Sequence, residues 1–154
     1  MTIIAALVAT LQLWMFGPET VPPHIVAAAD RPGVSATVSL ADQRMYVVVI
    51  DKMGFKKTFA WKVSTGKDGF DTPTGAWKPT RLSIDHHSKT YGDAPMPYAV
   101  FFTGGYAVHA TEAVGRLGQP ASHGCVRLAL ENAATFFQLV QSYGARNTAI
   151  AITA

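Results

Sequence analysis

The chain has 154 residues, of which 49% are hydrophobic and 15% charged, as in an ordinary globular protein and unlike a disordered or fibrous one. A chain of this length can bury the core of one domain without disulfides. The net charge is +3 and the Lys and Arg residues form no run, so the composition does not support nucleic-acid binding.

The first 29 residues have the features of a secretory signal peptide. Residues 2–17 are an apolar stretch, shorter than the roughly 20 residues that span a bilayer, and residues 27–29 form an A-x-A cleavage site. Residues 18–33 are Pro-rich and are expected to form an irregular linker. The alternative is a buried or amphipathic N-terminal helix, because no Lys or Arg precedes the apolar stretch. We predict a signal peptide over 1–29 and no stable membrane span.

The first half of the remaining chain predicts a three-stranded meander. Alternating or continuous apolar residues between short turns predict strands over 34–40, 45–50 and 55–63. A Gly-, Pro- and Asp-rich loop follows over 64–77, and its Gly-Lys pair lacks the spacing of a phosphate-binding loop. Residues 78–97 are polar and rich in turn formers, so a solvated loop is expected there.

The second half predicts two strands, one helix and a closing strand. The strands are expected over 98–102 and 106–109, and the last strand over 147–152. Apolar residues at helical spacing predict a helix over 130–143, with Gly144 as its C-cap. The predicted class is therefore a β-rich α+β fold, in a single domain over 30–154.

Cys125 is the only cysteine, so an exported form of this chain has no internal disulfide. Its thiol either packs in the core as a small apolar side chain or takes part in a reaction. A nucleophilic thiol needs an activating partner, and two histidines are near in sequence. His109 ends the strand over 106–109, and His123 lies two residues before the cysteine.

The residues around Cys125 suggest a nucleophile held in a tight turn. Gly124 indicates an unusual backbone conformation, and successive N–H groups in such a turn can form an oxyanion hole. His109 comes from a different element and is the expected base. A zinc site is disfavoured, since the chain has no C-x-x-C pair and no H-E-x-x-H helix. On the residues alone, thiol catalysis and a structural thiol both remain open.

The segment over 106–128 resembles the catalytic motif of the L,D-transpeptidase (YkuD-type) domain of bacterial cell-wall enzymes. In that motif a His is followed, after a spacer, by Ser or Thr and then His-Gly-Cys. Here twelve residues separate His109 from Ser122, which begins the run Ser-His-Gly-Cys-Val-Arg-Leu. Val-Ser-Thr-Gly-Lys over 63–67 and Asp-Thr-Pro-Thr-Gly over 71–75 are also similar to the family. The resemblance covers about residues 34–152.

The resemblance implies a fold and a set of site residues. The fold is a mixed β-sheet or sandwich with one main helix after the catalytic cysteine. Cys125 is the nucleophile and His109 the proton donor and acceptor, which the backbone carbonyl of Ala110 orients. The supporting residues that shape the turn are Ser122, His123, Gly124 and Arg127. Arg127 either meets a carboxylate or forms a surface salt bridge, and neither a metal nor a cofactor is implied.

The resemblance also implies a reaction on peptidoglycan stem peptides. The thiolate attacks the carbonyl of the third residue of a stem tetrapeptide, D-alanine leaves, and an amine of a neighbouring stem resolves the thioester into a 3→3 cross-link. With water as acceptor the enzyme is an L,D-carboxypeptidase, and with a protein as acceptor it is a protein-to-peptidoglycan ligase. A wall-binding module without activity is a third possibility. The expected location is the periplasm or the cell-wall side of the envelope.

Overall fold

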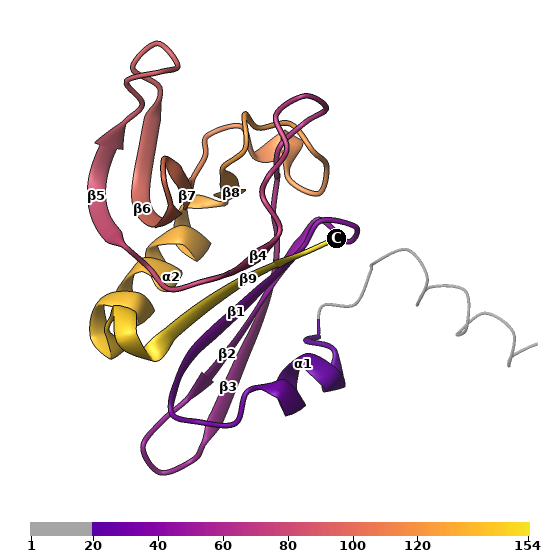
Figure 1. The fold of residues 1–154 in the computed structure, drawn as a ribbon, viewed down its shortest axis with the longest axis vertical. Helices are drawn as coiled ribbons and strands as arrows, with labels where there is room; N and C mark the ends of the chain where they lie inside the picture. Colours follow the sequence, from indigo (N-terminus) through magenta and orange to yellow (C-terminus); the bar gives the residue numbers. More distant parts are fainter. Residues whose placement is uncertain (1–19) are drawn as a thin grey trace, which may run out of the picture.

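Two mixed β-sheets and one long helix surround a shared core (Figure 1). The computed structural model describes residues 20–154. Sheet A has the strand order β3-β2-β1-β9-β4, and sheet B the order β5-β6-β7-β8. The predicted β-rich α+β fold, with one main helix after Cys125, is confirmed.

The strand and helix bounds are as follows. Sheet A consists of β1 (Gly33–Ser39), β2 (Arg44–Ile50), β3 (Lys56–Lys62), β4 (Gly75–Trp77) and β9 (Thr148–Thr153). Sheet B consists of β5 (Arg81–His87), β6 (Pro95–Thr103), β7 (Tyr106–Ala110) and β8 (Val126–Leu128). The helices are α1 (Pro23–Ala28) and α2 (Leu130–Tyr143), with 3-10 turns η2 (Val114–Arg116) and η3 (Ala145–Asn147).

The strand connections explain why both sheets are mixed. β1, β2 and β3 form the predicted antiparallel meander. β9 pairs with β1 in parallel and with β4 antiparallel, so it lies inside sheet A and not at its edge. In sheet B, β7 is antiparallel to β6 but parallel to β8.

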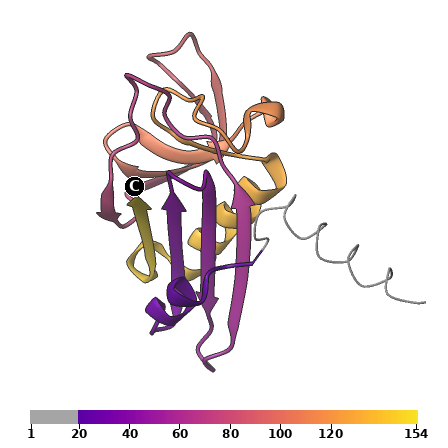
Figure 2. The ribbon, with the colours of Figure 1, turned by 90° about the vertical axis from the view of Figure 1, so that its right-hand side faces the viewer.

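Helix α2 occupies the predicted range and fills the space between the sheets (Figure 2). Its buried side chains, which recur at helical spacing, are Ala133, Phe136, Phe137 and Val140. They join the inward-facing residues of both sheets in one apolar cluster. Gly144 ends the helix with a φ of 84°, and its N–H donates to the Val140 carbonyl over 2.8 Å. The helix thereby holds β6 and β7 of sheet B against sheet A.

After Arg44, strand β2 is a run of buried residues without a charge, because both of its faces are covered. Its inner face joins the main core, while Tyr46, Val48 and Ile50 point to the opposite side. There they meet Val21, Ala29 and the half-buried side chains of α1. The Lys56 ammonium donates to the carbonyls of Val26 and Ala29, which fastens this segment to β3.

Residues 20–29 thus differ from the predicted irregular linker, since they contain α1 and pack on sheet A. The apolar stretch 2–17 lies outside the described residues. Among residues 20–154, no helix is long and apolar enough to cross a membrane.

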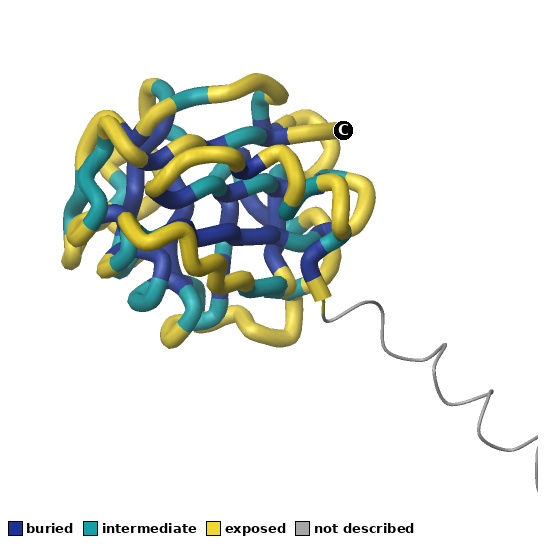
Figure 3. The backbone as a smooth tube through the Cα atoms, turned by 90° about the horizontal axis from the view of Figure 1, so that it is seen from below, coloured by how far each residue is buried: buried dark blue, intermediate teal, exposed yellow. Residues whose placement is uncertain are grey.

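Three short or polar strands were not predicted: β4, β5 and β8. β5 is at the edge of sheet B and none of its residues is fully buried, so its sequence carries no apolar alternation. β4 and β8 have three residues each, too few for a periodic pattern. Figure 3 shows buried segments running through the middle of the molecule, with the exposed segments at its periphery.

We expect Phe136→Ala to lower the free energy of unfolding by about 3–5 kcal/mol, because it empties a fully buried site between the sheets. Gln138→Ala, on the exposed side of the same helix, is the matched control and should change this energy by less than about 0.5 kcal/mol. Urea unfolding followed by circular dichroism measures both. Equal losses for the two variants would contradict the packing described for α2.

Candidate active site

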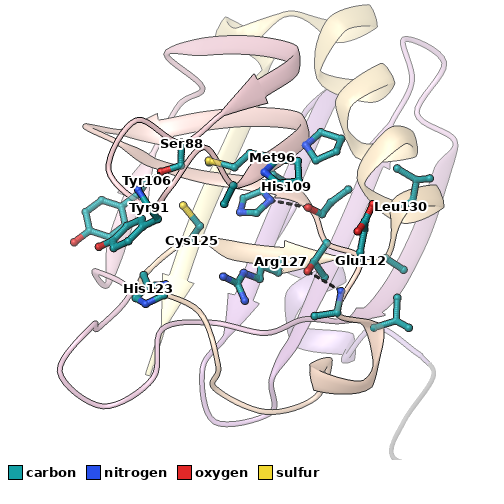
Figure 4. Close-up of a pocket in the computed structure, with 18 of the residues that line it drawn as sticks. Ser88, Tyr91, Met96, Tyr106, His109, Glu112, His123, Cys125, Arg127 and Leu130 are labelled. Atoms are coloured by element: carbon teal, nitrogen blue, oxygen red, sulfur yellow. Dashed lines mark hydrogen bonds between the residues drawn. The ribbon is translucent and has the colours of Figure 1, made fainter.

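Cys125 and His109 both line one cavity of about 1060 Å³ (Figure 4). Its walls come from the tip of the β5–β6 hairpin, the end of β7 and the chain after it, the turn before β8, and the start of α2. The parallel pairing of β7 and β8 places His109 opposite Arg127, two residues after Cys125. The two residues predicted as nucleophile and base are therefore brought to the same place by adjacent strands.

The Cys125 thiol is partly enclosed by the β6–β7 connection. Its sulfur lies 3.8 Å from the Gly105 carbonyl, to which the thiol can donate a weak hydrogen bond. The side chain packs against the small cluster of Met96, Ala99, Phe101 and Ala107. Cys125 is the single cysteine of the chain and is not in a disulfide.

The His109 ring is fixed by the residue that follows it. Its Nδ1 lies 2.7 Å from the Ala110 carbonyl oxygen (Figure 4). A carbonyl only accepts, so this hydrogen bond requires the proton on Nδ1 and leaves the Nε2 lone pair free in the neutral ring. This is the contact that the family resemblance implied for Ala110. It prepares His109 to accept a proton at Nε2.

Burial keeps both partners neutral at physiological pH. His109 is 5% exposed, and its burial lowers its pKa to about 4, against the opposing effect of the Ala110 hydrogen bond. Burial raises the pKa of the Cys125 thiol, although a backbone hydrogen bond from Ala107 and the charge of Arg127 oppose the rise. Both shifts favour a thiol and an imidazole over a thiolate and an imidazolium. Attack by the sulfur then requires proton transfer to His109.

The turn before β8 is held by the Ser122 hydroxyl. It donates to the Cys125 carbonyl over 2.6 Å and accepts from the Gly124 N–H over 3.0 Å. Gly124 has a φ of 120°, and a Cβ there would lie 2.5 Å from the Tyr106 ring, so both backbone and space require glycine. The role predicted for Ser122 and Gly124 in shaping the turn agrees with this geometry.

One expectation about the oxyanion hole has to be corrected. The Gly124 N–H is occupied by Ser122, so it is not free to bind a substrate oxygen. Among residues 20–154, no hydrogen-bond partner is found for the N–H groups of His123 and Cys125. These two groups are the remaining backbone donors beside the thiol.

His123 forms part of the cavity wall and does not orient the thiol. Its ring stacks on Tyr91, with the centroids 4.3 Å apart, and meets Phe70 edge-on at 4.8 Å. Tyr91 comes from the β5–β6 hairpin, in the segment predicted as a solvated loop. Neither aromatic partner was recognised from the sequence, because no local pattern marks a contact between residues more than 30 positions apart.

Arg127 supplies a positive charge to the cavity (Figure 4). In the described part of the chain its guanidinium takes part in no ion pair, so the alternative of a surface salt bridge is not found. The Arg127 N–H donates to the Ser64 carbonyl, and the Ser64 N–H donates to the Arg127 carbonyl. These two hydrogen bonds hold β8 in place. The charge is therefore available to an anionic group in the cavity.

Two carboxylates also line this cavity. Glu112 follows β7 and Glu131 is in the first turn of α2. Neither residue was singled out from the sequence. Within residues 20–154, no group of three or more His, Cys, Asp or Glu side chains is arranged to hold a metal ion.

Two further histidines lie outside the cavity. His86 is on β5, with its ring edge-on to Phe101, and His87 lies near Asp85 and Asp93 at the surface. Neither lines the cavity. Tyr98, on β6, packs on Phe137 of α2 with the ring centroids 5.7 Å apart.

Solved structures of L,D-transpeptidases share this fold. One from Stackebrandtia nassauensis is 26% identical, with a TM-score of 0.67, and covers 81% of this chain and 57% of that one. One from Mycobacterium smegmatis is 25% identical, with a TM-score of 0.65 and coverage of 79% and 59%. One from Mycobacterium tuberculosis H37Rv is 20% identical, with a TM-score of 0.68 and coverage of 80% and 58%. The chain thus spans less than two thirds of the length of these relatives.

A search among curated proteins finds no match. The family model of the L,D-transpeptidase catalytic domain (YkuD) matches residues 33–150, which is most of the chain and contains every site residue described above. The chain therefore belongs to the L,D-transpeptidase catalytic domain family.

Proposed function

We propose that this protein is a peptidoglycan L,D-transpeptidase that forms 3→3 cross-links through a thioester on Cys125. The observation that carries the proposal is the placement of Cys125 in one cavity with a histidine whose Nδ1 is tied to the Ala110 carbonyl. This arrangement suits acyl transfer, because the free Nε2 can take the thiol proton and later return it. The family membership supplies the class of substrate.

The first half of the proposed reaction forms the acyl-enzyme. The Cys125 sulfur attacks the carbonyl carbon of the third stem residue while the thiol proton moves to Nε2 of His109. The oxygen that becomes negative is stabilised by the free N–H groups beside the sulfur. The C–N bond then breaks, the departing D-alanine amine takes the proton from His109, and a thioester remains. Arg127 is placed to attract the carboxylate of the departing residue.

The second half transfers the acyl group to an amine. An acceptor amine attacks the thioester, gives its proton to His109, and the thiol is restored. The carboxylates of Glu112 and Glu131 in the same cavity favour a positively charged group nearby. This observation supports an amine acceptor over water, and hence a transpeptidase over a carboxypeptidase.

Incubation of the purified protein with tetrapeptide-containing muropeptides, followed by mass spectrometry, tests this function. We expect cross-linked dimers that have lost one D-alanine, and we expect Cys125→Ala to abolish them because no nucleophile remains. Tripeptide without dimers would instead indicate a carboxypeptidase, and transfer to an added protein would indicate a ligase. Full turnover by Cys125→Ala would refute acyl transfer through this residue.

We expect the rate of Cys125 alkylation by iodoacetamide to keep rising above pH 8. A raised thiol pKa leaves little thiolate at neutral pH, so each increase in pH supplies more of the reactive form. His109→Ala should slow alkylation at pH 7 by about tenfold or more, since the proton acceptor is lost. His86→Ala is the matched histidine control and should leave the rate unchanged. A rate plateau below pH 7 would indicate an ion pair and contradict the neutral resting state.

We further propose that the protein is exported to the periplasm or the cell-wall side of the envelope, with residues 1–29 as its signal peptide. Peptidoglycan stem peptides are found there, which makes the location consistent with the proposed substrate. Cleavage after Ala29 would remove α1 from the outer face of β2, whereas a cut before Val21 would leave it in place.

N-terminal sequencing of the exported protein tests the location and the cleavage site together. We expect a first residue at Asp30, because the A-x-A site precedes it. A start upstream of Val21 would move the cleavage site but keep export. An intact Met1 on a protein retained in the cytoplasm would contradict export.

A further inference from the structure

The Thr72 hydroxyl makes two hydrogen bonds that reach the back of the catalytic turn. It accepts from the Gly66 N–H over 2.9 Å and donates to the Gly124 carbonyl over 2.7 Å. The side chain is 4% exposed, so water does not compete strongly for either bond. Because one bond uses the oxygen lone pair and the other uses the hydrogen, the direction of the hydroxyl is fixed.

The bond to Gly124 determines where the next N–H points. The peptide bonds of the described residues are all trans, so the Gly124 carbonyl and the Cys125 N–H lie in one rigid plane and point in opposite directions. Thr72 lines a separate, smaller cavity, whereas Cys125 lines the catalytic one. Holding the carbonyl toward Thr72 therefore turns the Cys125 N–H toward the catalytic side.

Thr72 is itself supported by a buried polar network. Gln43 bonds to Thr65 twice, from its amide nitrogen to the Thr65 hydroxyl over 2.7 Å and from the Thr65 N–H to its carbonyl oxygen over 3.1 Å. The Thr65 carbonyl accepts the N–H groups of Ala121 and Ser122. Gly66, the donor to Thr72, is the next residue in the chain. The loop that carries Thr72 is thus joined to the turn that carries Cys125 at two places, by the Thr65 carbonyl and by the Thr72 hydroxyl.

The geometry points to Thr72 as a positioning residue for the oxyanion hole. Ser122 occupies the N–H of Gly124 and Thr72 occupies its carbonyl, which leaves the Cys125 N–H as a fixed donor beside the thiol. When the sulfur–carbon bond forms, the carbonyl electron pair moves to oxygen and the thiol proton to His109. The Cys125 N–H then meets the negative oxygen without reorienting, and the pair returns as the leaving group departs. This inference rests on the proposed acyl transfer at Cys125, but not on its peptidoglycan substrate.

Two reactions of the same thiol separate this role from a general structural one. Acylation by p-nitrophenyl acetate passes through an oxyanion and releases p-nitrophenolate, which is measured by its absorbance. Alkylation by iodoacetamide displaces iodide at a saturated carbon and forms no oxyanion. We expect Thr72→Val to lower the acylation rate by about tenfold to hundredfold, because the peptide plane is no longer held. Its alkylation rate should stay within about twofold of the wild-type rate.

Two further variants complete the experiment. Thr72→Ser keeps the hydroxyl and should restore acylation to within a few-fold of wild type, while Thr74→Val, in the same loop but exposed, should match wild type. Thr72→Ala removes the same hydroxyl with less bulk and is assayed if Thr72→Val does not fold.

The outcomes are distinct. Equal losses in acylation and alkylation, unchanged acylation without the hydroxyl, or no recovery with serine would each overturn the inference. Since neither reagent contains peptidoglycan, a failure of the muropeptide assay would leave this result intact and would bear on the proposed function alone.

Discussion

The parallel pairing of β7 with β8 is the contact on which the active site depends. Three residue pairs form it, and one of them sets His109 beside Arg127. A parallel pair cannot be closed by a tight turn, so the chain must make an excursion between the strands. That excursion, residues 111–125, returns as the turn that carries Cys125. Cys125 and His109 therefore reach the same cavity from two segments, the turn before β8 and the end of β7.

The neutral state of the thiol and imidazole follows from this placement in a partly buried cavity. Burial opposes charge on both groups, and the positive charge of Arg127 favours the thiolate but disfavours the imidazolium. Burial is the largest of these effects and favours the uncharged thiol, the less nucleophilic form of the sulfur. Such a resting state protects the thiol, because the thiolate is the form that oxidants and other electrophiles attack.

The sequence predicted the elements whose patterns are local. The meander and α2 were recognised because their apolar residues recur with a period of two or at helical spacing. β5 was missed because an edge strand with polar residues shows no such pattern. At the site, Cys125, His109 and Ala110 were found through a motif with fixed spacing. Thr72 and Tyr91 reach the turn from distant segments, and their contacts depend on a sheet arrangement that periodicity does not encode.

The position of β9 inside sheet A has a consequence for the order of folding. Until the last strand of the domain is available, β4 has no strand partner and β1 is paired only with β2, because β9 pairs with both β1 and β4. A chain emerging from the ribosome, N-terminus first, therefore lacks a complete sheet A until Thr148–Thr153 has been made. Non-local pairing of this kind forms slowly. The domain therefore cannot close until the six residues of its last strand have been synthesised.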